Sequence, residues 1–454
     1  MSFALPAVDE AQAAAHLGQA IAIPTVSSPD APPELQRFED FHRFLQRAYP
    51  VLHRTLEREV LADHALLYRW PGVGGGKPFG LLAHMDVVPV EPGTEGDWTH
   101  PPFAGHVDDT LIWGRGASDD KCQLIAVMEA AETLLAAGFV PNRDVYLCFG
   151  HNEEILVGEG SGAGAIAEAL RARGVRLAFV LDEGGAVLAD PPFGLQTAAA
   201  MIGIAEKGYA DVRVTVRAPG GHAAEPPPHT ALGNLGRLLA AIESHPTKKR
   251  LIPTVRATFA ALAAHLGGAQ GFLLQHIAVT KPLVMAALAA NRQVAAMLHT
   301  TVAVTQAQGS PQANILPQAA SAVLNCRLLP GDTDGTLLAH LQRVAKGCGV
   351  AAEFTLLRYS SALAETSTAS PVFAHLASLT QELFGAVTVP YLVTGATDSR
   401  EYAGVADEIF RMVPFLLEDA ELDGMHGTDE RIKRGSLGLA VRFMTRFIVE
   451  QAEG

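Results

Sequence analysis

Short apolar segments of strand length alternate with longer segments of helical periodicity through the first 190 residues of the chain. The expected strands are 79–86, 144–150 and 177–185, and the expected helices between them are 122–138 and 163–174. Strands that alternate with helices are typical of a parallel sheet that is covered on both faces. The sequence therefore predicts an α/β fold with a doubly wound, mostly parallel sheet.

The pattern changes after residue 202. Three later segments alternate polar and apolar residues, as strands do in an antiparallel sheet with one exposed face: 206–218, 321–331 and 351–361. Helical segments lie between them. We therefore expect a smaller α+β domain over 203–362, inserted into a larger domain that consists of 1–202 and 363–454.

Composition and charge restrict the classes of function. Apolar residues make up 48% of the chain and charged residues 18%, which is typical of a globular protein. The net charge of −14 argues against nucleic acid or an anionic membrane as a partner, since both bind clustered Lys and Arg. The cysteines are scattered without CxxC spacing, which indicates a reduced chain without a structural zinc knuckle.

The N-terminal residues and the longest apolar stretch favour a cytoplasmic location. No basic segment precedes the first apolar residues, and Asp9 and Glu10 come early, so we expect no signal peptide. The stretch 282–304 contains Asn291 and Arg292 in its middle. This interruption favours an amphipathic helix or a buried pair over a membrane helix.

Polar residues follow the apolar part of each expected strand in the first domain. The pairs are His84 with Asp86, Glu153 with Glu154, and Asp182 with Glu183. The carboxyl ends of parallel strands meet at one edge of an open sheet, and ligands bind there. We therefore expect these side chains to lie close together.

An acidic helix start adds to this group. Asp119 and Asp120 open the helix 122–138, and a single carboxylate there would be ordinary helix capping. Several carboxylates at one edge repel each other and shift their pKa values, so the group needs a compensating cation. With His, Asp and Glu as the ligand types and no cysteine, the pattern indicates zinc or a similar transition metal.

The paired residues have a direct chemical interpretation. Residues i and i+2 of a strand point to the same side, so Asp86 can accept a hydrogen bond from one ring nitrogen of His84 and leave the other for a metal. Glu153 and Glu154 are adjacent and point in different directions, so one can bind the metal while the other faces the open coordination site. A metal lowers the pKa of bound water to about 7, and the second carboxylate can take the remaining proton.

Seven motifs occur in an order that resembles a known family. They are HMDVVPV, WTHPPFAG, GRGASDDK, GHNEE, LDEGG, EKG and MHGTDERI. Together they closely resemble the M20 metallopeptidases, and in particular the carboxypeptidase S-like branch that includes N-acyl-amino-acid hydrolases. The resemblance covers nearly the whole chain.

The resemblance implies a metal centre and a reaction. The centre would hold two zinc ions per subunit, with Co²⁺ or Mn²⁺ as substitutes. Asp119 would bridge the ions, His84 and Asp182 would bind one, and Glu154 and His426 the other. Glu153 would be the general base and Asp86 the partner that holds His84. The enzyme would hydrolyse an amide next to a free carboxylate, in a peptide C-terminus or an N-acyl amino acid.

The resemblance also implies a homodimer and a substrate pocket. The inserted domain would act as lid and dimerisation domain, and His222 would reach into the partner's active site and stabilise the developing oxyanion. Four further residues match positions that hold or line the substrate: Asn314, Arg327, Gly395 and Thr397. Arginine suits a free carboxylate because its planar fork binds two oxygens at once.

Three other functions are alternatives to this one. Gly158, Gly160 and Ala163 fit a dinucleotide-binding GxGxxG/A motif, with Asp182 at the next strand end. The neighbouring glutamates, including Glu159, would place the wrong charge beside a pyrophosphate. A serine hydrolase is disfavoured because Ser161 is not in GxSxG. The remaining alternative is a metal-binding regulator without catalysis on the same fold.

Overall fold

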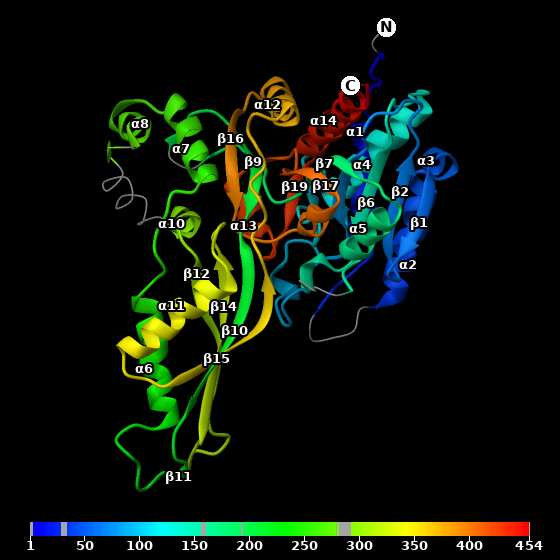
Figure 1. Cartoon of the computed structure of the whole chain (residues 1–454). Helices are drawn as coiled ribbons and strands as arrows, with labels where there is room; N and C mark the ends of the chain where they lie inside the picture. Colours follow the sequence, from blue (N-terminus) through cyan, green and yellow to red (C-terminus); the bar gives the residue numbers. More distant parts are fainter. Residues whose placement is uncertain are drawn as a thin grey trace. The chain divides into compact units, whose positions relative to one another are not determined.

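The chain divides into two compact units in the computed structural model, which describes residues 3–28, 34–155, 160–191, 194–277, 279–280 and 292–453. The first unit contains Met1–Ile204, Thr366–Pro390 and Thr397–Gly454. The second contains Ala205–Glu365 and Tyr391–Ala396. Figure 1 shows the first unit around the blue, cyan and red elements, and the second around the green and yellow ones.

A large sheet forms the centre of the first unit. Its four central strands are parallel, in the order β6 (Val145–Gly150), β3 (Phe79–His84), β7 (Leu177–Asp182) and β17 (Ala406–Arg411). All residues of β3 and β6 are buried, as expected for strands covered on both faces. The sheet continues with β1 (Glu57–Leu61) and β2 (Ala65–Trp70) at one side, and with β9 (Ala199–Glu206), β8 (Val187–Leu188), β18 (Leu416–Leu417) and β16 (Val387–Val393) at the other.

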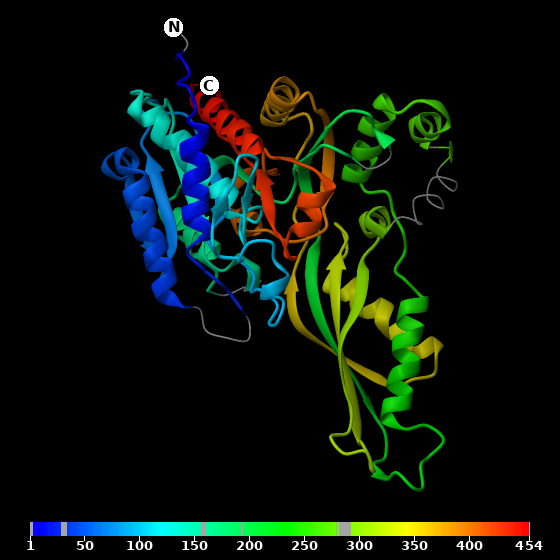
Figure 2. The same cartoon turned by 180° about the vertical axis from the view of Figure 1, so that it is seen from behind.

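Helices cover both faces of this sheet. On one face α4 (Lys121–Ala136) packs with α1 (Glu10–Ile21) and α14 (Arg434–Glu453), and on the other α5 (Gly162–Ala172) packs on β2 and β6 (Figures 1 and 2). The remaining helices are α2 (Leu35–Ala48), α3 (Pro50–Thr55), α12 (Pro371–Phe384) and α13 (Asp419–Gly424). The predicted doubly wound α/β class is confirmed.

A small sheet joins two segments of the first unit that lie far apart in the sequence. It consists of β4 (His106–Val107), β5 (Leu111–Trp113) and β19 (Arg431–Lys433). In β5 and β19 the antiparallel register pairs Trp113 with Arg431. The segment that follows β5 therefore runs beside the segment that precedes β19.

The second unit contains a four-stranded antiparallel sheet. The order is β12 (Thr301–Gln308), β14 (Ala319–Leu328), β10 (Gly208–Arg217) and β15 (Ala352–Ser360). Buried residues alternate along β10 and β14 and pack against α6 (Ala231–Ser244) and α11 (Asp334–Gly347), as the alternating sequence pattern predicts. The unit also contains β11 (Gly221–His222), β13 (Ile315–Leu316), α7 (Pro253–His265), α8 (Gly268–Gln275) and α10 (Arg292–Leu298).

Some predictions need correction or cannot be compared. An amphipathic helix over the whole of 282–304 is wrong at its end, because α10 stops at Leu298 and β12 starts at Thr301. Residues 282–291, Gly158 and Glu159 lie outside the described residues. In the part of the chain that the structure describes, no helix is long and apolar enough to cross a membrane.

Candidate metal centre

The polar strand ends come together at one edge of the large sheet. His84 is the last residue of β3 and pairs with Gly150 at the end of β6, while β7 pairs with the other side of β3. Glu153 and Glu154 follow β6 in a short 3₁₀ turn, Glu153–Ile155. This convergence is what the rule for carboxyl ends of parallel strands predicts.

Asp119 lies between two histidines. Its Oδ1 is 3.0 Å from His84 Nε2, and its Oδ2 is 2.9 Å from His426 Nε2. The same His426 nitrogen is 3.3 Å from Glu154 Oε1. One ligand atom each from His84, Asp119 and Glu154 fall within 4.8 Å of one another. The structure thus brings together four of the five predicted metal ligands.

Asp86 has a wider role than the sequence suggested. Nδ1 of His84 is 3.0 Å from the main-chain oxygen of Asp86 and 3.4 Å from its carboxylate Oδ1. The carboxylate also accepts the main-chain N–H groups of Glu153 at 3.1 Å and Glu154 at 3.2 Å. Asp86 is fully buried. It therefore orients both the histidine and the turn that carries the glutamate pair.

The carboxyl groups of the centre are crowded and buried. Burial, with the neighbouring charge of Asp119, raises the pKa of Glu154 to about 6. Burial, with the charges of Glu154 and Asp398, raises the pKa of Glu153 well above its usual range. The crowding of these acidic groups therefore favours their protonated forms, and a bound cation would favour the ionised ones.

The pKa values of the two histidines are raised by the same carboxylates. Hydrogen bonds to Asp119 and Glu154 raise the pKa of His426 to about 10. Burial lowers the pKa of His84, but its hydrogen bonds to Asp119 and Asp86 outweigh burial and hold it well above the ordinary value. Imidazole and carboxylate donors within bonding reach of one point suit zinc or a similar divalent ion, which would take the place of these protons. The residues present therefore fit a metal.

Asp182 and Glu183, the pair that follows β7, have different surroundings. Asp182 Oδ2 accepts the main-chain N–H of Ser399 at 2.7 Å, and among the described residues neither Asp182 nor Glu183 is in the group of close ligand atoms. Burial raises its pKa, while hydrogen bonds from the Glu183 main chain and the Thr397 side chain lower it. Glu183 instead has a pKa raised by burial and then by the charges of Asp119 and Glu153. The charges of Asp119 and Glu153 therefore reach the Glu183 carboxyl group.

His426 lies on a turn with no secondary-structure signal. Its backbone has φ of 58°, and its side chain is 50% exposed. A positive φ is uncommon for a residue other than glycine, and the surrounding structure must hold it there. Only the resemblance pointed to this residue, because GMHGTDE alone looks like a surface turn.

The predicted substrate residues fall mainly in the second unit. His222 on β11 pairs with Ile315 on β13, and the N–H of Ala223 donates to the carbonyl of Asn314, so His222 and Asn314 are neighbours. The guanidinium of Arg327 lies 4.8 Å from the centre of the Tyr209 ring. Gly395 follows β16 in the second unit, whereas Thr397 belongs to the first, where its hydroxyl lies 2.6 Å from Ser399 Oγ.

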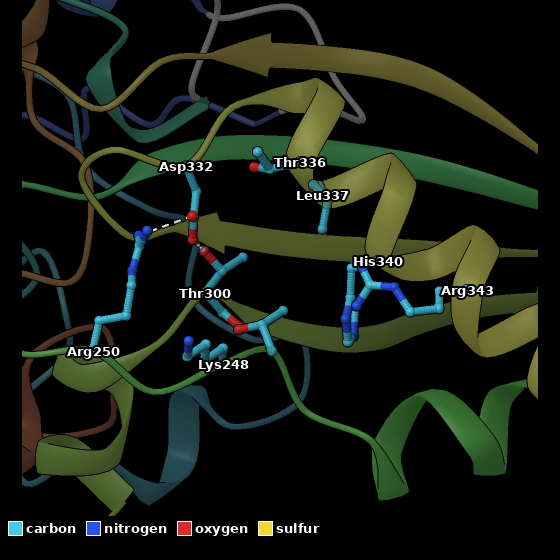
Figure 3. A pocket seen from close by; sticks show the side chains of 9 residues that line it. Lys248, Arg250, Thr300, Asp332, Thr336, Leu337, His340 and Arg343 are labelled. Carbon is cyan, nitrogen blue, oxygen red and sulfur yellow. Dashed lines mark hydrogen bonds and ion pairs between the residues drawn. The ribbon is translucent and has the colours of Figure 1, made fainter.

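A cationic pocket of about 170 Å³ lies elsewhere in the second unit (Figure 3). None of the predicted site residues lines it. Arg250 Nη2 is 2.8 Å from Asp332 Oδ1, and Thr300 donates to the other oxygen of Asp332. The side chains of Arg250 and Thr300 thus both bond to Asp332. The imidazole and carboxylate groups that could bind a metal lie in the first unit.

Comparisons with known proteins identify the family of this chain. The model of peptidase family M20/M25/M40 matches residues 80–450. A probable carboxypeptidase S-like protein of Dictyostelium discoideum is 35% identical over 402 residues, which cover 87% of this chain and 76% of the relative. An N-fatty-acyl-amino acid synthase/hydrolase of Xenopus tropicalis is 31% identical over 440 residues, which cover 94% and 84%.

A solved structure shows the same fold. An M20 family metallo-carboxypeptidase from Sulfolobus solfataricus superimposes with a TM-score of 0.70 at 17% identity, over 96% of this chain and 98% of the other. The predicted resemblance to the carboxypeptidase S-like branch is thus confirmed. The chain belongs to peptidase family M20/M25/M40 and is a hydrolytic enzyme.

Proposed function

We propose that this enzyme uses two zinc ions to hydrolyse an amide next to a free carboxylate, with Glu153 as general base. The observation that carries the two-metal part is the placement of Asp119, whose two oxygens each lie about one hydrogen bond from a different histidine. A carboxylate placed in this way can bind two ions at once. Co²⁺ or Mn²⁺ could substitute for zinc, since the donors are imidazole and carboxylate.

The ligand sets follow from the contacts around Asp119. Glu154 and His426 would hold one ion, because Glu154 Oε1 and Asp119 Oδ2 both lie within 3.3 Å of His426 Nε2. His84 would hold the other. As its acidic partner we propose Glu183 in place of Asp182, since the charges of Asp119 and Glu153 act on the Glu183 carboxyl group, whereas Asp182 Oδ2 accepts the N–H of Ser399.

The reaction would depend on a proton transfer by Glu153. Divalent ions bound at this centre would polarise the scissile carbonyl and lower the pKa of water to about 7. Glu153 would take the proton from the attacking water and pass it to the leaving amine. Asp86 supports this role by holding the main-chain N–H of Glu153, which keeps the glutamate turn in place.

The substrate class is supported by the relatives and by one arginine. Carboxypeptidases and hydrolases of N-fatty-acyl amino acids, as the two relatives are named, share an amide whose amine side carries a free carboxylate. Arg327, with Asn314, would bind that carboxylate. His222 would stabilise the oxyanion in the partner subunit of a homodimer formed through 203–362, and Gly395 and Thr397 would line the pocket. We also propose a cytoplasmic location, in line with the free cysteines Cys122, Cys148, Cys326 and Cys348.

The test of this function is a set of substrate pairs that differ only in the free carboxylate. We expect the zinc-loaded and cobalt-loaded enzyme to release the amino acid from dipeptides or N-acyl amino acids, and to cleave the matching carboxamides much more slowly. Arg327→Met should remove most of this discrimination, by about 10- to 100-fold in kcat/KM. The readout is the released amine, measured for both members of each pair.

Arg358→Met is the matched control. Arg358 is an exposed arginine on β15, which pairs with β10 in the same sheet, so its loss changes the charge of the unit equally. It should leave the discrimination intact. Equal rates on the acids and the carboxamides in the wild type would refute the substrate class. Absence of turnover on every amide tested would favour the regulator without catalysis.

The acidic partner of His84 can be identified by comparing two isosteric changes. Glu183→Gln should lower the metal content from two ions to one per subunit and reduce kcat by at least about 100-fold, because a ligand is lost. Asp182→Asn should keep both ions, since its remaining oxygen can still accept the N–H of Ser399. Metal content by mass spectrometry, together with kcat, distinguishes them, and the reverse pattern would restore Asp182 as the ligand.

A further inference from the structure

Glu430 connects two segments that carry metal-type ligands. Its side chain is fully buried, and Oε1 accepts the main-chain N–H groups of Gly116 at 3.0 Å, Ser118 at 2.9 Å and Asp119 at 3.2 Å. The same oxygen also accepts the hydroxyl of Ser118 at 3.0 Å. One carboxylate oxygen thus holds the loop that ends in Asp119.

Arg115 makes the complementary contacts from that loop. It is 2% exposed, and its Nη1 lies 2.6 Å from Glu430 Oε2. Its Nη2 donates to the carbonyl oxygens of His426 at 3.2 Å and Gly427 at 3.1 Å. The fork of the guanidinium therefore reaches the Glu430 carboxylate with one nitrogen and the turn that presents His426 with the other.

The two segments are also joined through the backbone. The N–H of Gly114 donates to the carbonyl of Glu430 at 2.8 Å, directly beyond the pairing of Trp113 with Arg431. The small sheet therefore places Arg115 and Glu430 next to each other. Both are buried, yet neither carries a side-chain atom in the group of ligands around Asp119.

We propose that the Arg115–Glu430 pair is a positioning device that fixes the spacing between Asp119 and His426 and thereby sets the affinity of the metal ion these two residues share. The proposal rests on the metal centre proposed above. His426 depends most on this support, because it is half-exposed, has a positive φ, and lies on a turn outside any strand or helix. A ligand on such a turn must otherwise be ordered when the metal binds, which weakens binding.

A merely structural role predicts a different result. A buried ion pair that loses one partner destabilises the fold, wherever it lies. A positioning role predicts, in addition, weaker binding of the ion held by Glu154 and His426 than of the other ion. Partners that orient metal ligands change metal affinity by about 10- to 100-fold when they are mutated.

Two variants and one control separate these roles. Glu430→Gln leaves one oxygen and one N–H₂ group on the side chain. If the oxygen still accepts from the loop, the N–H₂ group faces Arg115. If the oxygen faces Arg115, the hydrogen bonds to the loop are lost. Arg115→Lys keeps the charge beside Glu430 and loses the second nitrogen that reaches the His426 carbonyl. Glu129→Gln is the matched control, because Glu129 is a buried carboxylate of the same unit that bonds to His16 and Tyr49.

The experiment titrates each metal-free protein with zinc in competition with a chromophoric chelator and follows the cobalt-loaded forms by absorption spectroscopy. We expect both variants to bind one of the two zinc ions 10- to 100-fold less tightly and to change the cobalt spectrum. Glu129→Gln should match the wild type in both readouts even if its melting temperature falls. If Glu430→Gln does not fold, Arg115→Lys carries the test alone.

The outcomes are distinct from those for the proposed function. Wild-type zinc affinity and an unchanged cobalt spectrum in both folded variants would overturn the positioning role while leaving the metal centre intact. An equal loss of zinc affinity in Glu129→Gln would also overturn it, because the effect would then follow general stability. A wild type that binds no zinc would refute the proposed metal centre itself.

Discussion

Replacing Glu153 with glutamine is expected to lower kcat by roughly 100- to 10,000-fold while both metal ions stay bound. Glutamine has the same shape as glutamate but cannot take a proton from water. The turn that carries the residue should remain in place, because Asp86 holds its main-chain N–H and that of Glu154. The measurement is kcat on an N-acyl amino acid, with metal content determined on the same preparation.

The comparison with Glu154→Gln sharpens this prediction. Glu154 Oε1 is within 3.3 Å of His426 Nε2, so Glu154→Gln should lower both the metal content and kcat. Glu153→Gln should lower kcat and leave the metal content unchanged. If Glu153→Gln retained near-wild-type kcat with two ions bound, the assigned proton transfer would be wrong. If it lost an ion, Glu153 would be a ligand and not the base.

The strand ends could be predicted from the sequence because their convergence is a general property of parallel sheets. Apolar runs of strand length identify β3, β6 and β7, and polar residues directly after such runs must lie at one edge. The position of His84, Glu153 and Glu154 follows from that rule alone. No long-range information was needed to place them together.

The choice between Asp182 and Glu183 as a ligand cannot be made in this way. Adjacent residues at a strand end point in opposite directions, so the one that faces the site depends on where the strand stops. The strand β7 includes Asp182, and one oxygen of its carboxylate accepts the N–H of Ser399. Ser399 is more than two hundred residues away in the sequence, and no local pattern reveals this contact.

His426 and its supports were hidden for a related reason. The turn at His426 has no periodic pattern, and its main chain accepts a hydrogen bond from Arg115, which is more than three hundred residues earlier in the chain. The pairing of β5 with β19 brings these segments together, but both strands have only three residues. Strands of that length leave almost no hydrophobic signal in a sequence.

Replacing Asp119 with asparagine is expected to lower both metal binding and turnover, with metal content well below two ions per subunit and kcat reduced by more than about 1,000-fold. Asparagine keeps one oxygen but presents N–H₂ where the second oxygen lay, so it cannot accept from both His84 Nε2 and His426 Nε2. It also removes the negative charge that pairs with two cations. Both consequences follow from the contacts of 3.0 and 2.9 Å on opposite oxygens.

The matched control is Asp144→Asn in the same unit. Asp144 also uses both oxygens, accepting from Arg69 at 2.7 Å and from the N–H of Gly72 at 2.8 Å, but it contacts none of the metal-type ligands. This variant should bind two ions and retain turnover. A wild type that binds a single ion, or an Asp119→Asn variant that keeps two, would contradict the bridge. The ions would then have to be held by separate residues, and the shared position of Asp119 between His84 and His426 would be a hydrogen-bonding arrangement only.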